Sequence, residues 1–251
     1  MNYWLKAQNE FAIHSPFVFD LYTNVIQSNQ QYYAFFEIEN QRKRLLKNAH
    51  TIEIQDFGAG SRVFDSTQRQ VNKIVHYSAI NKAQGQLLFK LVNRFQPEYI
   101  LELGTSLGLS TLYLSKAKSS AKVHTFEGCE ETARLAQELF QISAAHNITM
   151  VTGKLEDTLQ NTIKALPAVD FVFFDANHRL APTLEYFEIC LQKSHSDSIF
   201  VFDDIYWSSE MQQAWNAIKK HPEVTLTLDL FKLGLVFFSD KFEKQHFTLR
   251  F

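Results

Sequence analysis

Cysteine is scarce in this sequence, and so are glycine and proline. The 251 residues include 2 cysteines, Cys129 and Cys190, with 8 glycines and 5 prolines. The two cysteines are far apart and form neither a CxxC pair nor a metal-type spacing, so we predict that both are reduced, buried thiols. The chain contains no internal repeat and no low-complexity tract, which leaves an ordinary globular protein as the expectation.

Strong charge and long apolar runs are also missing. The formal net charge is −2, which gives no electrostatic reason to expect nucleic acid or an anionic membrane as a partner. No apolar run approaches the ~20 residues that span a bilayer. The opening segment "MNYWLKAQNE" lacks the apolar core of a signal peptide. A cytoplasmic protein is therefore expected.

What the sequence does contain is a regular alternation of apolar runs and amphipathic stretches from about residue 97. The apolar runs, each predicted to be a strand, are "YILEL" (99–103), "KVHTF" (122–126), "ITMV" (148–151), "DFVFF" (170–174) and "SIFVF" (198–202). Helical spacing fills the segments between them, and a helix over 82–95 precedes the first. This order predicts an α/β fold with a doubly wound, mostly parallel sheet buried on both faces.

The two ends of the chain differ from this pattern. "VTLTLDLF" and "KLGLVFFSD" follow each other without room for a crossover helix, so they should pair antiparallel. "HFTLRF" (246–251) is either a short edge strand or a tail. Residues 1–80 show helical spacing, with Ser15 as a predicted N-cap before Pro16. We therefore predict a helical extension or cap over 1–80 and a main domain over 81–251.

Two glycine-containing stretches compete for the place of a cofactor-binding turn. "ILELGTSLGLST" (100–111) has an apolar strand before it and a helical face after it, as such a turn requires in an open α/β sheet. "DFGAGSRV" (56–63) has a weak strand before it and polar residues after it. The stretch at 100–111 is therefore the predicted site. The stretch at 56–63 is either a loop that closes over the site, with Arg62 contacting an anionic group of the substrate, or a plain surface turn.

The details of the predicted turn indicate which cofactor it binds. Gly104 and Gly108 are spaced GxxxG, without the third glycine of the dinucleotide fingerprint GxGxxG. Glu102 lies two residues before the first glycine, where an acid suits a cationic ligand better than a phosphate. Glu127 follows the next strand, where it can accept hydrogen bonds from both hydroxyls of a ribose. Its alternative role is that of an acid at the N-terminus of the following helix.

With "LELGTSLGLST" and "FEG" one strand later, the chain resembles the class I S-adenosylmethionine-dependent methyltransferases. The resemblance covers roughly residues 82–240 and implies a Rossmann-like sheet of seven strands with an antiparallel C-terminal strand. It implies S-adenosyl-L-methionine as the cofactor and a small-molecule methyl acceptor. The residues that it assigns to the cofactor are Glu102, Gly104, Thr105, Ser106 and Gly108 around the methionine part, Glu127 and Gly128 at the ribose, Gly153 and Lys154 near the adenine, and Asp175.

Acids also end the fourth and fifth predicted strands. "FVFFDANHR" provides Asp175 and His178, and "IFVFDDIYWS" provides Asp203 and Asp204. Carboxyl ends of parallel strands line the ligand crevice, and three carboxylates there can bind Mg²⁺ or another divalent cation. In the alternative, they serve only as hydrogen-bonding partners or loop caps.

The spacing of these residues resembles that of the cation-dependent O-methyltransferases of the catechol and caffeoyl-coenzyme A types. That group carries an Asp at the end of strand four, a Lys three positions later and an Asp-Asn pair after strand five. Here His178 takes the place of Lys and Asp204 that of Asn. We predict that His178 acts as the catalytic base beside Asp175, and that Asp175, Asp203 and Asp204 hold the metal.

The sequence thus predicts an enzyme that transfers a methyl group to oxygen of a small molecule. A nicotinamide-dependent oxidoreductase and a cofactor-binding protein without catalysis are the alternatives from other classes. The acceptor, the need for a metal and the oligomeric state, for which a homodimer is one option, are left open.

Overall fold

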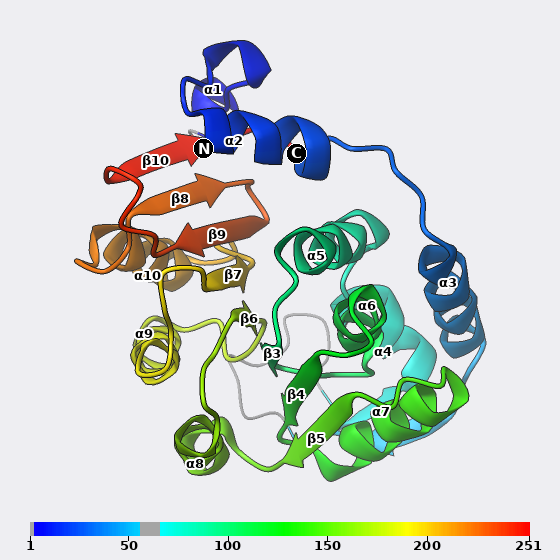
Figure 1. Cartoon of the computed structure of the whole chain (residues 1–251). Coiled ribbons are helices and arrows are strands. Elements are labelled where there is room, and N and C mark those ends of the chain that lie inside the picture. Colours follow the sequence, from blue (N-terminus) through cyan, green and yellow to red (C-terminus); the bar gives the residue numbers. More distant parts are fainter. Residues whose placement is uncertain (1–2, 56–65) are drawn as a thin grey trace.

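The computed structural model describes residues 3–55 and 66–251, so the segment "DFGAGSRV" lies outside the described residues. The main sheet has eight strands, and the helices cover both of its faces (Figure 1). From one edge to the other, its strands are β10 (Gln245–Thr248), β8 (Leu226–Asp229), β9 (Leu233–Phe237), β7 (Ile199–Asp203), β6 (Phe171–Phe174), β3 (Tyr99–Leu103), β4 (Lys122–Glu127) and β5 (Ile148–Thr152). All five strands that the alternating pattern predicted are present.

The sheet is parallel except for β9, which runs antiparallel to both β7 and β8. The predicted antiparallel pairing of the two last apolar runs is therefore confirmed. The sheet exceeds the seven strands implied by the resemblance, because β10 pairs parallel with β8 and forms a new edge. The segment "HFTLRF", for which the sequence left a strand or a tail open, therefore contributes to an edge strand.

Six helices connect and cover the parallel strands. They are α5 (Lys82–Phe95), α6 (Leu109–Ala117), α7 (Glu130–Ile142), α8 (Leu155–Ala165), α9 (Leu180–Leu191) and α10 (Ser209–Lys220). Helices α5, α6 and α7 share one apolar core with one face of the sheet. Helices α8, α9 and α10 share a second core with the other face. The prediction of a doubly wound sheet, buried on both faces, is confirmed.

The phenylalanine-rich strands follow directly from this burial. Along β6, Phe171 and Phe173 face the first core, whereas Val172 and Phe174 face the second. Successive side chains of a strand point to opposite faces, and here both faces are covered by helices. A strand in that position must be apolar at every residue, which explains the continuous run "FVFF". Cys129 and Cys190 are both free and buried, as predicted.

The N-terminal segment does not form one continuous layer. Its elements are α1 (Tyr3–Lys6), a 3₁₀ turn η1 (Glu10–Ala12), α2 (Pro16–Leu21), a π-helical turn η2 (Tyr22–Ile26), α3 (Tyr33–Leu46), β1 (Thr51–Glu53), β2 (Gln68–Gln70) and α4 (Val71–Ser78). Ser15 caps α2 through its hydroxyl, as predicted. Helix α1 lies beside β10 at the C-terminal end of the chain, whereas α3 packs on α6 (Figure 1).

The segment is also not wholly helical, because β1 and β2 form a separate antiparallel pair. A strand of three residues, in which only Ile52 is buried, is too short to give a clear period in the sequence. The predicted domain boundary at residue 80 stays a prediction.

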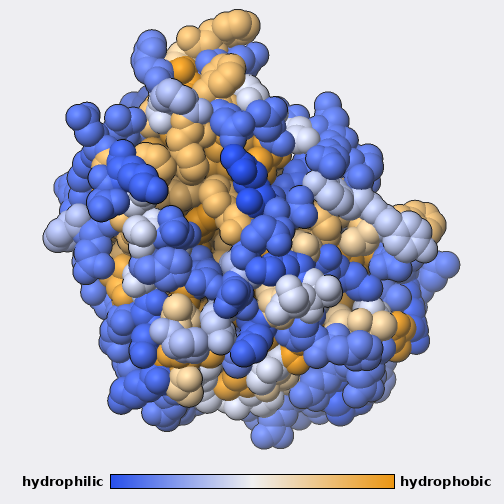
Figure 2. Space-filling model, viewed as in Figure 1, coloured by the Kyte–Doolittle hydropathy of each residue, from blue (hydrophilic) through white to orange (hydrophobic). Residues whose placement is uncertain are grey.

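The surface is mainly polar, and exposed apolar side chains gather at the end of the molecule where α1 lies (Figure 2). Trp4 is 63% exposed, Leu5 86% and Phe11 87%. Within the described residues, none of the helices has the length and hydrophobicity that crossing a membrane requires.

Candidate active site

A cavity of about 420 Å³ opens at the carboxyl ends of β3, β4, β6 and β7. Strand β3 lies between β4 and β6, and the chain adds strands to the sheet on both sides of it, first β4 and β5 and then β6 and β7. Such a reversal of strand order leaves a crevice at the strand ends, because the flanking connections diverge to opposite faces. The cavity is where this topology predicts a ligand.

The turn after β3 forms one wall of this crevice. The amides of Gly104 and Thr105 both donate to the carbonyl of Phe126, which ties the turn to the end of β4. A Cβ atom on Gly104 would lie 2.3 Å from the backbone oxygen of Asp175. The glycine is therefore needed because β6 ends directly against it. Gly108, also in a left-handed conformation, begins α6 and has the ring of Phe140 beside it.

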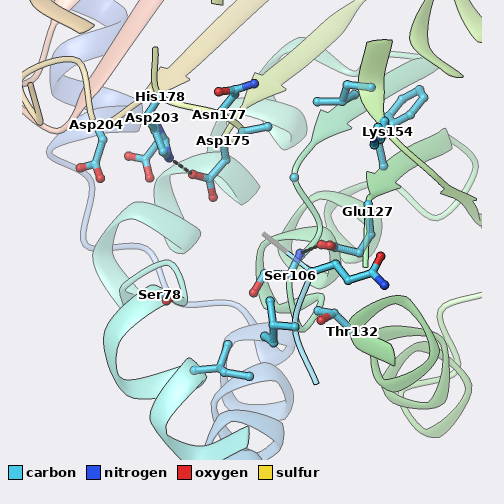
Figure 3. Close-up of a pocket in the computed structure, with 18 of the residues that line it drawn as sticks. Ser78, Ser106, Glu127, Thr132, Lys154, Asp175, Asn177, His178, Asp203 and Asp204 are labelled. Atoms are coloured by element: carbon cyan, nitrogen blue, oxygen red, sulfur yellow. Dashed lines mark hydrogen bonds and ion pairs between the residues drawn. The ribbon is translucent and has the colours of Figure 1, made fainter. Parts of the chain in front are cut away.

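Glu127 links this turn to the next strand. Its Oε2 accepts a hydrogen bond of 2.8 Å from the amide of Ser106, and its Oε1 accepts one of 3.0 Å from the amide of Cys129 (Figure 3). The second contact is the helix-terminal role that the sequence offered as an alternative, since Cys129 precedes α7. The carboxylate thus fixes the turn and the start of α7 together, and it lines the cavity.

The predicted cofactor residues divide into those that line the cavity and those that do not. The lining residues among them are Gly104, Ser106, Glu127, Gly128, Gly153, Lys154 and Asp175. Thr105 and Gly108 are not in the cavity wall. Neither is Glu102, which is fully buried and accepts hydrogen bonds from the hydroxyls of Thr111 and Thr125.

Burial raises the pKa of Glu102 to about 7, against about 4.3 for an unperturbed glutamate. At a pH between these two values, Glu102 is protonated in the folded protein but ionised in the unfolded chain. The stability contributed by this protonation is full below about pH 4.3 and is lost as the pH rises through about 7. Glu102→Gln, which mimics the protonated form, should therefore be more stable than the wild type by about 1–3 kcal/mol at about pH 8 and nearly equal to it at about pH 4.5.

Urea unfolding at both pH values measures this difference. Glu130→Gln, at the exposed start of α7, is the matched control and should shift neither curve. An equal gain for Glu102→Gln at both pH values would contradict the argument, because it would not depend on the carboxylate charge.

On the opposite side of the cavity lie the acids of β6 and β7 (Figure 3). The Nε2 atom of His178 lies 3.5 Å from Oδ1 of Asp175, with the side chains 23% and 21% exposed. Burial lowers the pKa of His178, but the hydrogen bond and charge of Asp175 outweigh burial and hold that pKa above its ordinary value. Burial, followed by the charge of Asp175, raises the pKa of Asp203. The structure therefore brings the predicted base and acids together.

Backbone strain concentrates at this site. Among the described residues, seven other than glycine have a positive φ, and four of these line the cavity. They are Ser106, Asn177, His178 and Asp204. Residues in this conformation cost free energy and occur preferentially at functional sites, where the surrounding structure holds them in place.

The three carboxylates predicted to bind a metal already have partners from the chain itself. Gln84 Nε2 donates to Oδ1 of Asp203 at 3.0 Å, and Lys232 Nζ lies 2.9 Å from Oδ1 of Asp204. Across residues 3–55 and 66–251, the His, Cys, Asp and Glu side chains include no group of three placed to hold a metal ion. The donor set as arranged does not fit a divalent cation.

Sequence reasoning missed the wall that the N-terminal segment contributes. Residues Ile54, Gln55, Arg69, Ile74, Tyr77 and Ser78 line the cavity from the β1–β2 pair and α4. It also missed Gln84 and Lys232. The turn "FKLG" between two predicted antiparallel strands was a visible signal for Lys232, but its use requires knowing that β9 pairs with β7.

A doubly wound sheet, a glycine turn after β3 where the strand order reverses, and an acid after the next strand are typical of α/β proteins that bind a nucleotide-type cofactor. Residues 101–205 match a family model described as a methyltransferase domain. The matched residues include the glycine turn after β3, Glu127 and Asp175, and the description of the family agrees with the resemblance that the sequence carries.

Among curated proteins, a catechol O-methyltransferase of Niastella koreensis is 28% identical over 130 residues, which are 51% of this chain and 58% of that protein. A Mycobacterium tuberculosis protein named as a probable O-methyltransferase is 28% identical over 199 residues, 68% of this chain and 84% of its own length. A solved O-methyltransferase from Bacillus cereus, in complex with SAH, has a TM-score of 0.59 at 20% identity and covers 88% of this chain and 96% of its own.

Proposed function

We propose that this protein transfers a methyl group from S-adenosyl-L-methionine to a hydroxyl oxygen of a small molecule. The observation that carries the proposal is the position of Glu127. Its carboxylate bridges the glycine turn and α7 at one side of a cavity, and the other side holds the Asp175–His178 pair. A cofactor side and a proton-accepting side thus face the same space, as methyl transfer to oxygen requires.

The residues proposed for the cofactor follow its parts. Glu127 and Gly128 meet the ribose hydroxyls, and Gly153 and Lys154 border the adenine. Gly104, Thr105, Ser106 and Gly108 shape the turn around the methionine part, with Asp175 beside it. Oε1 of Glu102 is buried without a hydrogen-bond partner in the described part of the chain. Glu102 lies behind the turn and outside the cavity wall, so its proposed part is to hold β3 to α6 and β4 through the hydroxyls of Thr111 and Thr125.

The chain's own residues would prepare the acceptor. Bound S-adenosyl-L-methionine supplies an electrophilic methyl group on a sulfonium. His178 keeps one proton on Nε2, directed at Asp175, and accepts the hydroxyl proton of the acceptor at Nδ1. Asp175 stabilises the imidazolium that results. Trp207, whose ring centroid lies 5.9 Å from that of His178, helps to exclude water from this side of the cavity.

Calorimetric titration with S-adenosylhomocysteine tests the cofactor assignment. The wild type should bind, and Glu127→Ala should weaken binding by the ~1.5–3 kcal/mol of a charge-assisted hydrogen bond, or roughly 10- to 150-fold. Glu130→Ala, three residues further along the chain, is the matched control and should bind like the wild type. Thermal unfolding of each variant verifies that the fold is retained.

Each contrary outcome has its own meaning. Lack of binding by the wild type would contradict the methyltransferase proposal and would call for titration with NADH. Binding by the wild type and equally by Glu127→Ala would instead remove Glu127 from the site. The homodimer and the cytoplasmic location remain predictions.

A further inference from the structure

We propose that Lys232 is the fixed positive charge of the acceptor site, and that its ammonium stands at Asp204 where a divalent cation would otherwise bind. The inference rests on the proposed function and specifies which group balances the negative charge of Asp204 in that site. It assigns Lys232 as a positioning residue, acting through Asp204.

Each carboxylate of the group already has a partner within the chain. Asp175 has His178 at 3.5 Å, Asp203 has Gln84 at 3.0 Å, and Asp204 has Lys232 at 2.9 Å. Oxygen ligands of Mg²⁺ or Ca²⁺ must converge on one ion with their lone pairs available. Here the Asp204 oxygen faces an ammonium, so an ion would have to displace Lys232 before Asp204 could bind it.

Lys232 lies on a turn that the chain holds in a strained conformation. This turn connects β8 to β9 and is closed by the amide of Leu230, which donates to the carbonyl of Leu233. Within it, Phe231 has a left-handed backbone, which is strained for an aromatic residue. Asp229 holds that conformation, because its Oδ1 accepts a hydrogen bond of 3.0 Å from the amide of Phe231.

Further contacts secure the same turn from outside. The hydroxyl of Tyr206 donates to Oδ2 of Asp229 at 2.6 Å, and its ring stacks on Phe231 at a centroid distance of 5.5 Å. Tyr3 packs on Phe231 at 5.0 Å, and Trp4 at 5.9 Å. Tyr3 is itself held by a hydrogen bond from its hydroxyl to the carbonyl of Leu249. Helix α1 thus supports the turn that presents Lys232, and the residue after β10 holds α1 in place.

The position of Asp204 is equally constrained. Register pairs Asp203 with Leu233, so the residues that follow β7 lie beside those that precede β9. Asp204 also has a left-handed backbone, and its carbonyl accepts from the amide of Trp207. The side chain of Lys232 is 53% exposed and that of Asp204 23%. Ion pairs of such exposure contribute little to stability, so two strained segments that meet at this pair point to a role in the site.

Manganese binding tests the proposal without any methyl acceptor. Electron paramagnetic resonance of free Mn²⁺ should show no site of one ion per chain in the wild type. Lys232→Met should create such a site, with binding at least about tenfold tighter than in the wild type, since removal of the ammonium returns an oxygen ligand and a negative charge. Lys232→Arg, which keeps the charge, should behave like the wild type.

Two further variants make the test specific. Asp204→Asn in the Lys232→Met background should abolish the new site. Lys241→Met, an exposed lysine in the segment between β9 and β10, should change nothing. Tight binding of Mn²⁺ by the wild type, or no binding by Lys232→Met, would overturn the proposal. Binding of S-adenosylhomocysteine is followed in the same samples, so failure of the proposed function is seen separately.

Discussion

Replacing Gly104 by alanine is expected to destabilise the protein by about 2–4 kcal/mol and to abolish cofactor binding. Gly104 has a φ of +103°, and an added Cβ would lie 2.3 Å from the backbone oxygen of Asp175. Backbone cannot rotate away as a side chain can, so the end of β6 must move. Because that movement carries Asp175 and His178 with it, stability and the site are lost together. Urea unfolding and titration with S-adenosylhomocysteine measure the two effects.

Gly153→Ala provides the matched control. Gly153 also has a left-handed backbone and lines the same cavity, but an added Cβ would meet only the methyl group of Thr158, at 3.2 Å. It should therefore show the conformational cost of about 1 kcal/mol without the collision. If Gly104→Ala were no less stable than Gly153→Ala, the close approach of β3 and β6 would not be what requires the glycine.

His178→Gln is expected to lower kcat by about 10²–10⁴ while changing KM little. Glutamine retains hydrogen bonding at this position but cannot take up a proton at neutral pH. The acceptor would then lose its proton only to solvent. Catechol is a suitable probe because relatives of this chain are named for it, and single-turnover kinetics with saturating cofactor separate methyl transfer from binding.

The chain offers a second histidine–aspartate pair as a control. His195 Nε2 lies 2.7 Å from Oδ1 of Asp170, which precedes β6, whereas Asp175 follows the same strand. Neither His195 nor Asp170 lines the cavity. His195→Gln should leave kcat unchanged. An equal loss of activity in both variants would attribute the effect to stability, and an unchanged rate in His178→Gln would show that the base lies elsewhere.

The acids at the strand ends show which features of the site a local sequence pattern can predict. The sequence placed Asp175, His178, Asp203 and Asp204 at the ends of two strands, and because neighbouring parallel strands end at one edge, it predicted that they meet. The structure brings them together. Their hydrogen-bonding partners did not follow in the same way, since Gln84 reaches Asp203 across 119 positions of the chain.

Glu102 is a residue whose surroundings could not be predicted from the sequence. Its place before the glycine turn suggested a ligand contact, but alternation along β3 decides which face it occupies. On that face the carboxyl group is buried, and the hydroxyls of Thr111 and Thr125 donate hydrogen bonds to it. A polar residue in an apolar strand is visible in the sequence, whereas the partners that satisfy it belong to other elements.

By itself, then, the sequence determined the order of strands and helices, the glycine turn after β3 and the acids that follow the strands. These depend on periods of two and 3.6 residues and on short motifs, which are properties of neighbouring residues. Only the tertiary structure decided that α4 lines the cavity, that α1 braces the β8–β9 turn and that Lys232 meets Asp204. Those contacts depend on strand order and on the register of Asp203 with Leu233. Register is fixed by burial across the whole sheet, and no local pattern contains it.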